Sequence, residues 1–284
     1  MIHVAARPSS PIPPYLEAAS CEEGAKLLET IICDLHWRAL HTATLATLMT
    51  ANIDTNANWT LRPWRHVLVG GAGDSMQLAL RYDGRAGLQG PAAKSIASVY
   101  KGFAALKESS ASLVLVVRSY NSQERQLLAQ CAPQWRRLSR EMATLLRSLK
   151  ASVQLRVGDD YAADCQTLLD FSEEAASGVT RRVNAWGNIE LPQLRQRRQA
   201  PRMKVARNCE ICTDRERIPA VMTDLSRLGM GVTCDRALAS CEPVTVAFTG
   251  GRSLRATVVR TTREGMGLRF IEELLVDDPL LRTS

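Results

Sequence analysis

The spacing of hydrophobic residues changes once along this chain of 284 residues. Before about residue 190, apolar side chains recur every three or four residues, which is the period of an amphipathic helix. After about residue 203, short segments rich in Val, Ile, Thr and Arg alternate with turns, as β-strands do. Two periods predict two modules, and the length agrees, because a single domain usually spans about 100 to 200 residues. We therefore expect an α+β multidomain protein with a mostly α-helical N-terminal domain.

The clearest helical repeat lies between Leu128 and Leu149, where apolar residues follow one another at alternating steps of three and four. This spacing is a heptad seam. After a turn at Gly158, a second seam is expected from Tyr161 to Trp186. The two seams predict an antiparallel helical hairpin, and they fit an intramolecular core and a homodimer interface equally well. Further helices are expected over residues 22–51 and 92–108.

Six short strands are expected in the C-terminal part, over residues 203–213, 216–223, 230–235, 243–249, 252–262 and 265–270. Six antiparallel strands of this length favour a closed β-barrel, because closure removes exposed strand edges. A short helix within residues 271–281 is expected to cover one end of the barrel. The predicted organisation is a flexible tail (1–14), a mostly helical interaction domain (15–190), a linker (191–202) and the barrel (203–284).

The first 20 residues contain several prolines and lack the apolar run of a secretion signal. The longest uncharged stretch, between Arg38 and Asp54, is too short and too polar for a membrane span. Eight cysteines in a chain of this length do not resemble the dense disulfide framework of a small secreted domain. We therefore expect a cytoplasmic protein with reduced thiols.

The positive charge of the chain is concentrated near the start of the expected barrel. The net charge is +7, and residues 195–207 contain six Lys and Arg side chains with no acidic residue. Such a segment attracts anions. Charge alone does not choose between a nucleotide, a nucleic acid and a membrane surface.

Two motifs lie in and after this basic segment. Arg198 and Arg202 form an RxxxR motif, and residues 224–229 read DxSxxG at the end of an expected strand. Alone, the first would be most simply a solvated linker and the second a turn cap. In this order and with six strands around the second, they resemble the PilZ domain family of bacterial cyclic di-GMP receptors, over roughly residues 195–275. The resemblance implies a signal-transduction role, with nucleotide binding as its central activity.

The chemistry of the motifs suits that ligand, which carries two phosphates and two guanines. Arginine can fork onto phosphate oxygens or onto guanine O6 and N7, and it can stack on a base. By the resemblance, Arg198 and Arg202 close over the ligand while Asp224 and Ser226 contact a guanine. The resemblance also includes two further residues. Arg197 is expected to favour a stacked pair of ligand molecules, and Gly229 is expected to provide a backbone angle or a close approach that a Cβ would prevent.

Cys209 and Cys212 are spaced as CxxC, which is a common spacing of zinc ligands. An odd separation of three sends two side chains to opposite faces of a strand, so we expect no metal there. The four histidines do not form a ligand pattern either. No pair of nucleophile and base indicates an enzyme, and we expect no cofactor.

The function predicted from the sequence is a cyclic di-GMP receptor that acts through its helical domain on a protein partner or on a homodimer. A nucleic-acid-binding module that uses the basic segment is the alternative from another class. A PilZ-type adaptor that binds no ligand is a third. Residues 1–190 resemble no family that would identify the partner or the pathway.

Overall fold

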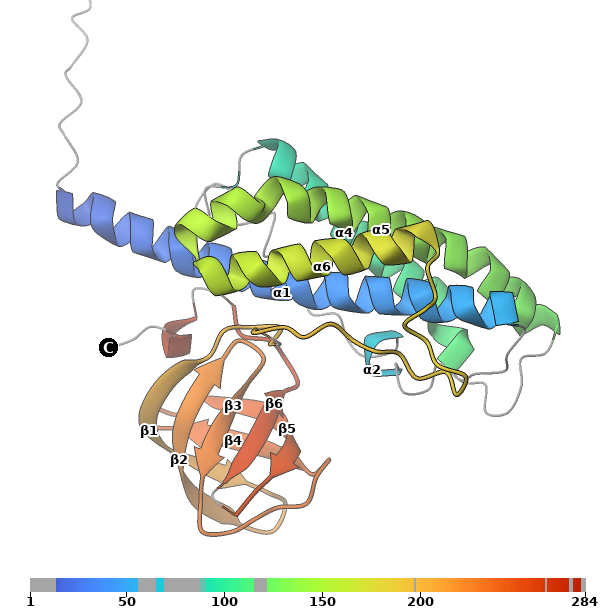
Figure 1. Ribbon diagram of the computed structural model, residues 1–284. Helices are drawn as coiled ribbons and strands as arrows, with labels where there is room; N and C mark the ends of the chain where they lie inside the picture. The colour runs from blue at the N-terminus through green and yellow to red at the C-terminus, as the bar shows by residue number, and fades with distance from the viewer. Residues whose placement is uncertain are drawn as a thin grey trace, which may run out of the picture.

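The computed structural model describes residues 14–55, 65–68, 88, 90–114, 122–196, 198–263, 265–275 and 278–281. Four long helices lie alongside one another, and a β-barrel lies beneath them in the view of Figure 1. The segment that joins the two parts runs between the helices and the barrel before it enters the first strand. The predicted α+β architecture is therefore confirmed, although the exact domain boundaries stay a prediction.

The helical part consists of six described elements. They are α1 (Pro14–Thr55), α2 (Arg65–Leu68), α4 (Gly90–Ser110), the 3-10 helix η2 (Ala111–Val114), α5 (Ser122–Arg156) and α6 (Asp159–Ser177). Helix α5 packs against α1, α4 and α6. Its Trp135 lies at the centre of the core, where the ring meets Phe103 edge-on at 5.6 Å and the indole N–H donates to Ser110 Oγ at 2.9 Å.

The heptad seam of α5 is confirmed as a buried face. All seven of its residues are buried, and they pack inside this chain. The residues are Leu128, Cys131, Trp135, Leu138, Met142, Leu145 and Leu149. The helix continues through Pro133, which lies inside it. The core interpretation of this seam is therefore supported.

The second seam ends earlier than predicted. Helix α6 ends at Ser177 because Gly178 adopts a left-handed conformation with φ of 82°, and its N–H bonds the carbonyl of Ala175. This is an ordinary glycine C-cap. Trp186, which was predicted on the buried seam, is 85% exposed instead. The predicted burial of Trp186 was wrong because the helix stops nine residues earlier, after Cys165, Leu168 and Ala175 have been buried.

The barrel contains the six predicted strands. They are β1 (Met203–Cys212), β2 (Arg217–Ser226), β3 (Gly229–Thr233), β4 (Pro243–Phe248), β5 (Ser253–Thr261) and β6 (Met266–Phe270). All neighbours are antiparallel, and the closed order is β1-β2-β3-β6-β5-β4. Alternate residues of each strand face a core built from apolar side chains, so the barrel is filled.

Cys209 and Cys212 lie as the strand period predicts. Cys209 is buried in the barrel core, whereas Cys212, three residues later, is half-buried on the opposite face of the strand. Within the part of the chain that the structure describes, no group of three or more His, Cys, Asp or Glu side chains is arranged to hold a metal ion.

The C-terminal helix predicted within residues 271–281 is reduced to a 3-10 turn, Pro279–Leu281. Asp278 fixes this turn to the barrel, because both of its oxygens accept from Arg252, at 2.7 and 2.5 Å. Among the described helices, none is both long and apolar enough to cross a membrane.

Candidate ligand site at the junction of helices and barrel

The two motifs meet in the folded protein. Arg202 directly precedes β1, and β1 pairs with β2 so that Met203 lies opposite Leu225 and Lys204 opposite Asp224. This register brings the Arg202 guanidinium to 2.5 Å from Asp224 Oδ1. The two side chains are 27% and 30% exposed, so they form an ion pair that ligand and solvent can reach. The second arginine of RxxxR therefore contacts the carboxylate of DxSxxG.

The first arginine of the motif is exposed to solvent. Arg198 is exposed, and its guanidinium has no hydrogen-bond or ion-pair partner among the described residues. Arg197 lies outside the described residues. Of the two arginines predicted to act with Asp224, the structure brings Arg202 to this carboxylate and leaves Arg198 exposed to solvent.

Ser226 holds the turn between β2 and β3. Its hydroxyl is buried, donates to the carbonyl of Gly229 at 3.0 Å and accepts the backbone N–H of Leu228 at 3.3 Å. These bonds stabilise a tight connection, which is the ordinary use of serine at such a position. The predicted contact of Ser226 with a guanine stays a prediction, and its structural use is to fix the end of β2 on which Asp224 stands.

Gly229 is required by a close approach of two strands. A Cβ at this position would lie 2.1 Å from the carbonyl oxygen of Leu268 on β6. That is far inside van der Waals contact, so a side chain would force β3 away from β6. Of the two reasons predicted for this glycine, a backbone angle or a close approach that excludes a Cβ, the structure shows the close approach, and the neighbour is a strand of the barrel.

Gly231 belongs to the site and was missed by sequence reasoning. A Cβ at Gly231 would lie 2.6 Å from Asp224 Oδ2 and 3.0 Å from Thr223 Oγ1. The missing side chain leaves the space in which the Asp224 carboxylate lies beside Arg202. The sequence signal for it was the second glycine of Gly229-Met230-Gly231, directly after the motif.

The basic segment is docked on the helices. The carboxylate of Asp164 on α6 accepts the backbone N–H groups of Arg195 and Gln196, at 2.9 and 2.7 Å. Three residues later, Gln199 Nε2 donates to Asp34 Oδ1 on α1 at 3.0 Å. The linker is therefore tied to two helices. Sequence reasoning missed these contacts, and the only signal was a single acid within an apolar stretch of each helix.

Asp34 is charged although it is fully buried. Its second oxygen lies 2.8 Å from Arg38 Nε, and the Arg38 guanidinium covers the rings of Tyr100 at 4.5 Å and Phe103 at 5.0 Å. Burial by itself raises the pKa of Asp34, but the charge of Arg38 and the bond from Gln199 lower it by more. The carboxylate therefore stays ionised and is a strong acceptor for the linker amide.

A second ion pair joins the DxSxxG motif to the segment that follows β6. Arg227, inside DxSxxG, lies 3.2 Å from Glu273 Oε2, and its Nη1 donates to the carbonyl of Leu274 at 3.4 Å. Burial raises the pKa of Glu273, Arg227 opposes this, and Asp34 and Arg38 add smaller effects of opposite sign. Glu273 thus lies within electrostatic reach of α1.

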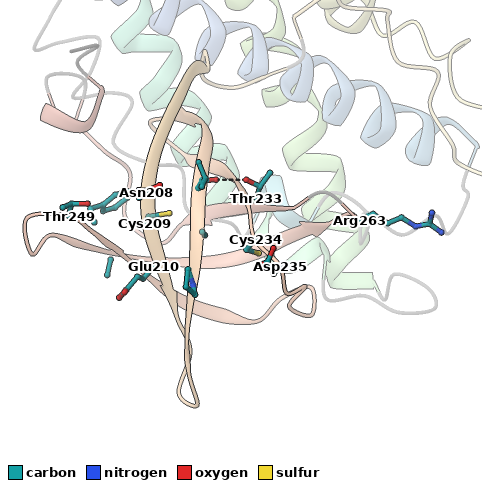
Figure 2. A pocket seen from close by; sticks show the side chains of 13 residues that line it. Asn208, Cys209, Glu210, Thr233, Cys234, Asp235, Thr249 and Arg263 are labelled. Atoms are coloured by element: carbon teal, nitrogen blue, oxygen red, sulfur yellow. Dashed lines mark hydrogen bonds between the residues drawn. The ribbon is translucent and has the colours of Figure 1, made fainter.

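A hollow of about 970 Å³ lies elsewhere on the barrel (Figure 2). Its walls include Cys209, Glu210, Cys234 and Asp235, and Arg263 extends away from it. None of its lining residues belongs to either motif. Burial raises the pKa of the Cys209 thiol to about 11, so this thiol is not a nucleophile at neutral pH. The candidate site is therefore the open, charged surface at the two motifs.

Comparison with known families identifies the C-terminal part. Residues 196–281 match the PilZ domain family model, and the match begins just before RxxxR and ends after β6 and the 3-10 turn. The N-terminal region has no family match. A search of curated proteins returned no match. The family is one of cyclic di-GMP receptors, and its domains are binding and adaptor modules, not enzymes.

Proposed function

We propose that this protein, with its PilZ domain at residues 196–281, is a receptor that binds cyclic di-GMP at the junction of helices and barrel. The observation that carries the proposal is the ion pair between Arg202 and Asp224, which joins the two motifs on one accessible surface. The ligand contacts are proposed for Arg198, Arg202 and Asp224, with Ser226 and Gly229 maintaining the turn beside them.

Binding would exchange one set of charged contacts for another. The guanine edge offers N1–H and N2–H, which two carboxylate oxygens of Asp224 can accept. Arg202 would then leave Asp224 and fork onto a phosphate. An ion pair between partly exposed side chains contributes only about 0 to 1 kcal/mol, so opening it costs the ligand little.

Arg198 supplies the second cation. Its guanidinium has no partner among the described residues, so no such guanidinium contact would have to be broken for it to meet the ligand. Together, Arg198 and Arg202 would match the two phosphates of one cyclic di-GMP. A role for Arg197 in retaining a second, stacked ligand molecule is part of the same proposal.

The output is proposed to pass through the linker to the helical domain. The linker is bonded to α6 through Asp164 and to α1 through Asp34, so a ligand that draws in the arginines would pull on a segment that both helices hold. The helical domain would then present a changed surface to a protein partner or to a second copy of the chain.

The ion pairs of the basic segment argue against the alternative of a nucleic-acid-binding module. Arg195 pairs with Asp160 and Arg202 pairs with Asp224, so two of its cations already have acidic partners. A long polyanion is bound through many unpaired cations, and its affinity falls steeply with salt. A bound dinucleotide depends instead on a few directed contacts.

The proposal is tested by differential scanning fluorimetry of the full chain with cyclic di-GMP, cyclic di-AMP or duplex DNA, at about 50 and 200 mM salt. A ligand that binds the folded state raises the melting temperature. We expect cyclic di-GMP alone to do so at both salt concentrations. Stabilisation by DNA only at low salt would favour the nucleic-acid module, and no effect of any ligand would favour the ligand-free adaptor.

A further inference from the structure

In each ligand motif, a residue that is not expected to touch the ligand makes a contact of its own. One of these contacts is with helix α1, and the other is an ion pair within the barrel domain. Gln199 lies between the two arginines of RxxxR and donates to Asp34 on α1 at 3.0 Å. Arg227 lies inside DxSxxG and pairs at 3.2 Å with Glu273, which is within electrostatic reach of Asp34 and Arg38. The residues that would hold the ligand therefore alternate along these short segments with residues that make other contacts, and one of these, Gln199, contacts helix α1.

We infer that Asp34 is a positioning residue of the ligand site, which holds the arginine segment in its ligand-free position through Gln199. The inference rests on the proposed function. Cyclic di-GMP and Asp34 compete for the same stretch of chain, so ligand binding releases Gln199 from α1. A residue of the helical domain thereby sets the affinity of the barrel for its ligand.

The linker geometry supports competition. Arg202 is turned toward Asp224 on the barrel, whereas Arg198 faces solvent without a partner among the described residues. If both arginines contact one ligand beside Asp224, we expect the stretch between them to move toward Asp224. Gln199 is in that stretch, so its bond to α1 opposes the movement. The anchors at Asp164 precede the motif and can stay in place as a pivot.

The chemistry of Asp34 makes the contact strong enough to matter. Asp34 is fully buried and ionised, and a hydrogen bond to a charged acceptor contributes more than one between neutral groups. When Gln199 leaves, Arg38 still holds the other carboxylate oxygen at 2.8 Å. The helical core therefore survives release, while the lost bond opposes ligand binding.

The test is isothermal titration of the full chain with cyclic di-GMP, comparing Gln199→Ala with the wild type. We expect about tenfold tighter binding by the variant, because the ligand no longer has to break a bond to a charged group. Gln196→Ala is the matched control, since this linker glutamine uses only its backbone N–H in the contact with Asp164. Its affinity should equal that of the wild type.

A second measurement needs no ligand. Trypsin should cleave after Arg198 several-fold faster in Gln199→Ala than in the wild type, because the segment is no longer held on α1, whereas Gln196→Ala should be cleaved at the wild-type rate. If the wild type binds cyclic di-GMP but Gln199→Ala binds it equally or more weakly, competition with Asp34 is disproved. If the wild type binds no cyclic di-GMP, the proposed function itself fails.

Discussion

Arg202 and Asp224 form an ion pair at 2.5 Å although 22 residues separate them in the chain. One belongs to the segment that enters β1 and the other to the end of β2, and the antiparallel register of these strands brings them together. At the proposed site, the two motifs are thus joined by their own charges. A dinucleotide that offers phosphates to the arginine and guanine donors to the carboxylate can replace both halves of this pair.

Replacing Asp224 by asparagine is expected to weaken cyclic di-GMP binding at least tenfold and to leave the fold intact. The amide has only one acceptor oxygen for the two guanine donors, and hydrogen bonds to charged groups contribute about 1.5 to 3 kcal/mol. The pair with Arg202 is partly exposed, so its loss should change the free energy of unfolding by less than about 1 kcal/mol. Calorimetry and urea unfolding measure the two effects.

Glu210→Gln is the control for this substitution. Glu210 is an exposed acid on β1 whose partner Arg217 lies 3.5 Å away, so it matches Asp224 in charge and setting but not in position. Its affinity should equal that of the wild type. Equal affinities for all three proteins would remove Asp224 from the site.

Replacing Gly229 by alanine is expected to lower the stability of the barrel, whereas replacing Gly231 by alanine is expected to lower the affinity for the ligand. At Gly229 the new Cβ would meet the Leu268 carbonyl at 2.1 Å, so the barrel should lose about 3 kcal/mol or more of stability. At Gly231 it would meet the flexible Asp224 carboxylate at 2.6 Å, which can turn aside. Gly231→Ala should therefore fold normally and bind cyclic di-GMP about tenfold more weakly.

Thermal melting and calorimetry on both glycine variants separate these outcomes. A Gly231→Ala protein that melts as early as Gly229→Ala would show that Gly231 serves strand packing, as Gly229 does. Unchanged affinity in a folded Gly231→Ala protein would show that the Asp224 orientation seen here is not needed by the ligand.

Ser226→Ala should lower stability and affinity together. The substitution removes the bonds to the Gly229 carbonyl and the Leu228 N–H, which costs about 1 to 2 kcal/mol at a buried turn. The end of β2 that carries Asp224 then loosens, so affinity falls as well. If affinity falls in this variant while urea unfolding is unchanged, the hydroxyl contacts the ligand directly.

The helical domain should lose stability in mild acid because of His36. Burial lowers the pKa of His36 to about 4 from its ordinary value of 6.5, so the unfolded chain takes up a proton before the folded chain does. Stability then falls as pH drops from 6.5 towards 4, by about 2 kcal/mol between pH 7 and pH 5. The pKa of Asp34 is lowered, so its contribution to the stability of the fold is lost only at more acidic pH. The pKa of Glu273 is raised, so protonation of this group on acidification favours the folded state.

Urea unfolding of the wild type and His36→Leu at the two pH values checks this dependence. His36 Nδ1 has no partner among the described atoms, and Nε2 lies 3.4 Å from Cys165 Sγ, so leucine fits an already apolar setting. The variant should lose about 2 kcal/mol less than the wild type on acidification. Identical losses would show that His36 is not the group responsible.

The barrel was predictable from the sequence because its signals are local. Each strand is marked by alternation and bounded by turn residues, and all six were found within a few residues of their observed ends. The ion pair of Arg202 with Asp224 was not predicted, although Arg202 directly precedes β1 and Asp224 lies on the adjacent antiparallel strand β2. The heptad seam of α5 was equally reliable, because every position in it is buried.

The errors and omissions have equally specific causes. The second seam was extended through Gly178, whose left-handed conformation ends α6 and leaves Trp186 exposed. The bond from Gln199 to Asp34 joins residues 165 positions apart, and no local pattern encodes it. Gly231 was missed because its role depends on a side chain of the neighbouring strand. Contacts between modules are set by tertiary packing, so periodicity does not reveal them.

The most direct test of the proposed function is isothermal titration of the full chain with cyclic di-GMP, in the wild type and in the double variant Arg198→Ala plus Arg202→Ala. The control is Arg215→Ala plus Arg217→Ala, which removes two arginines near the β1–β2 turn. We expect binding by the wild type and the control, and a loss of at least a hundredfold in the motif variant. No heat with the wild type, or equal affinity in the motif variant, would contradict the assignment of this site.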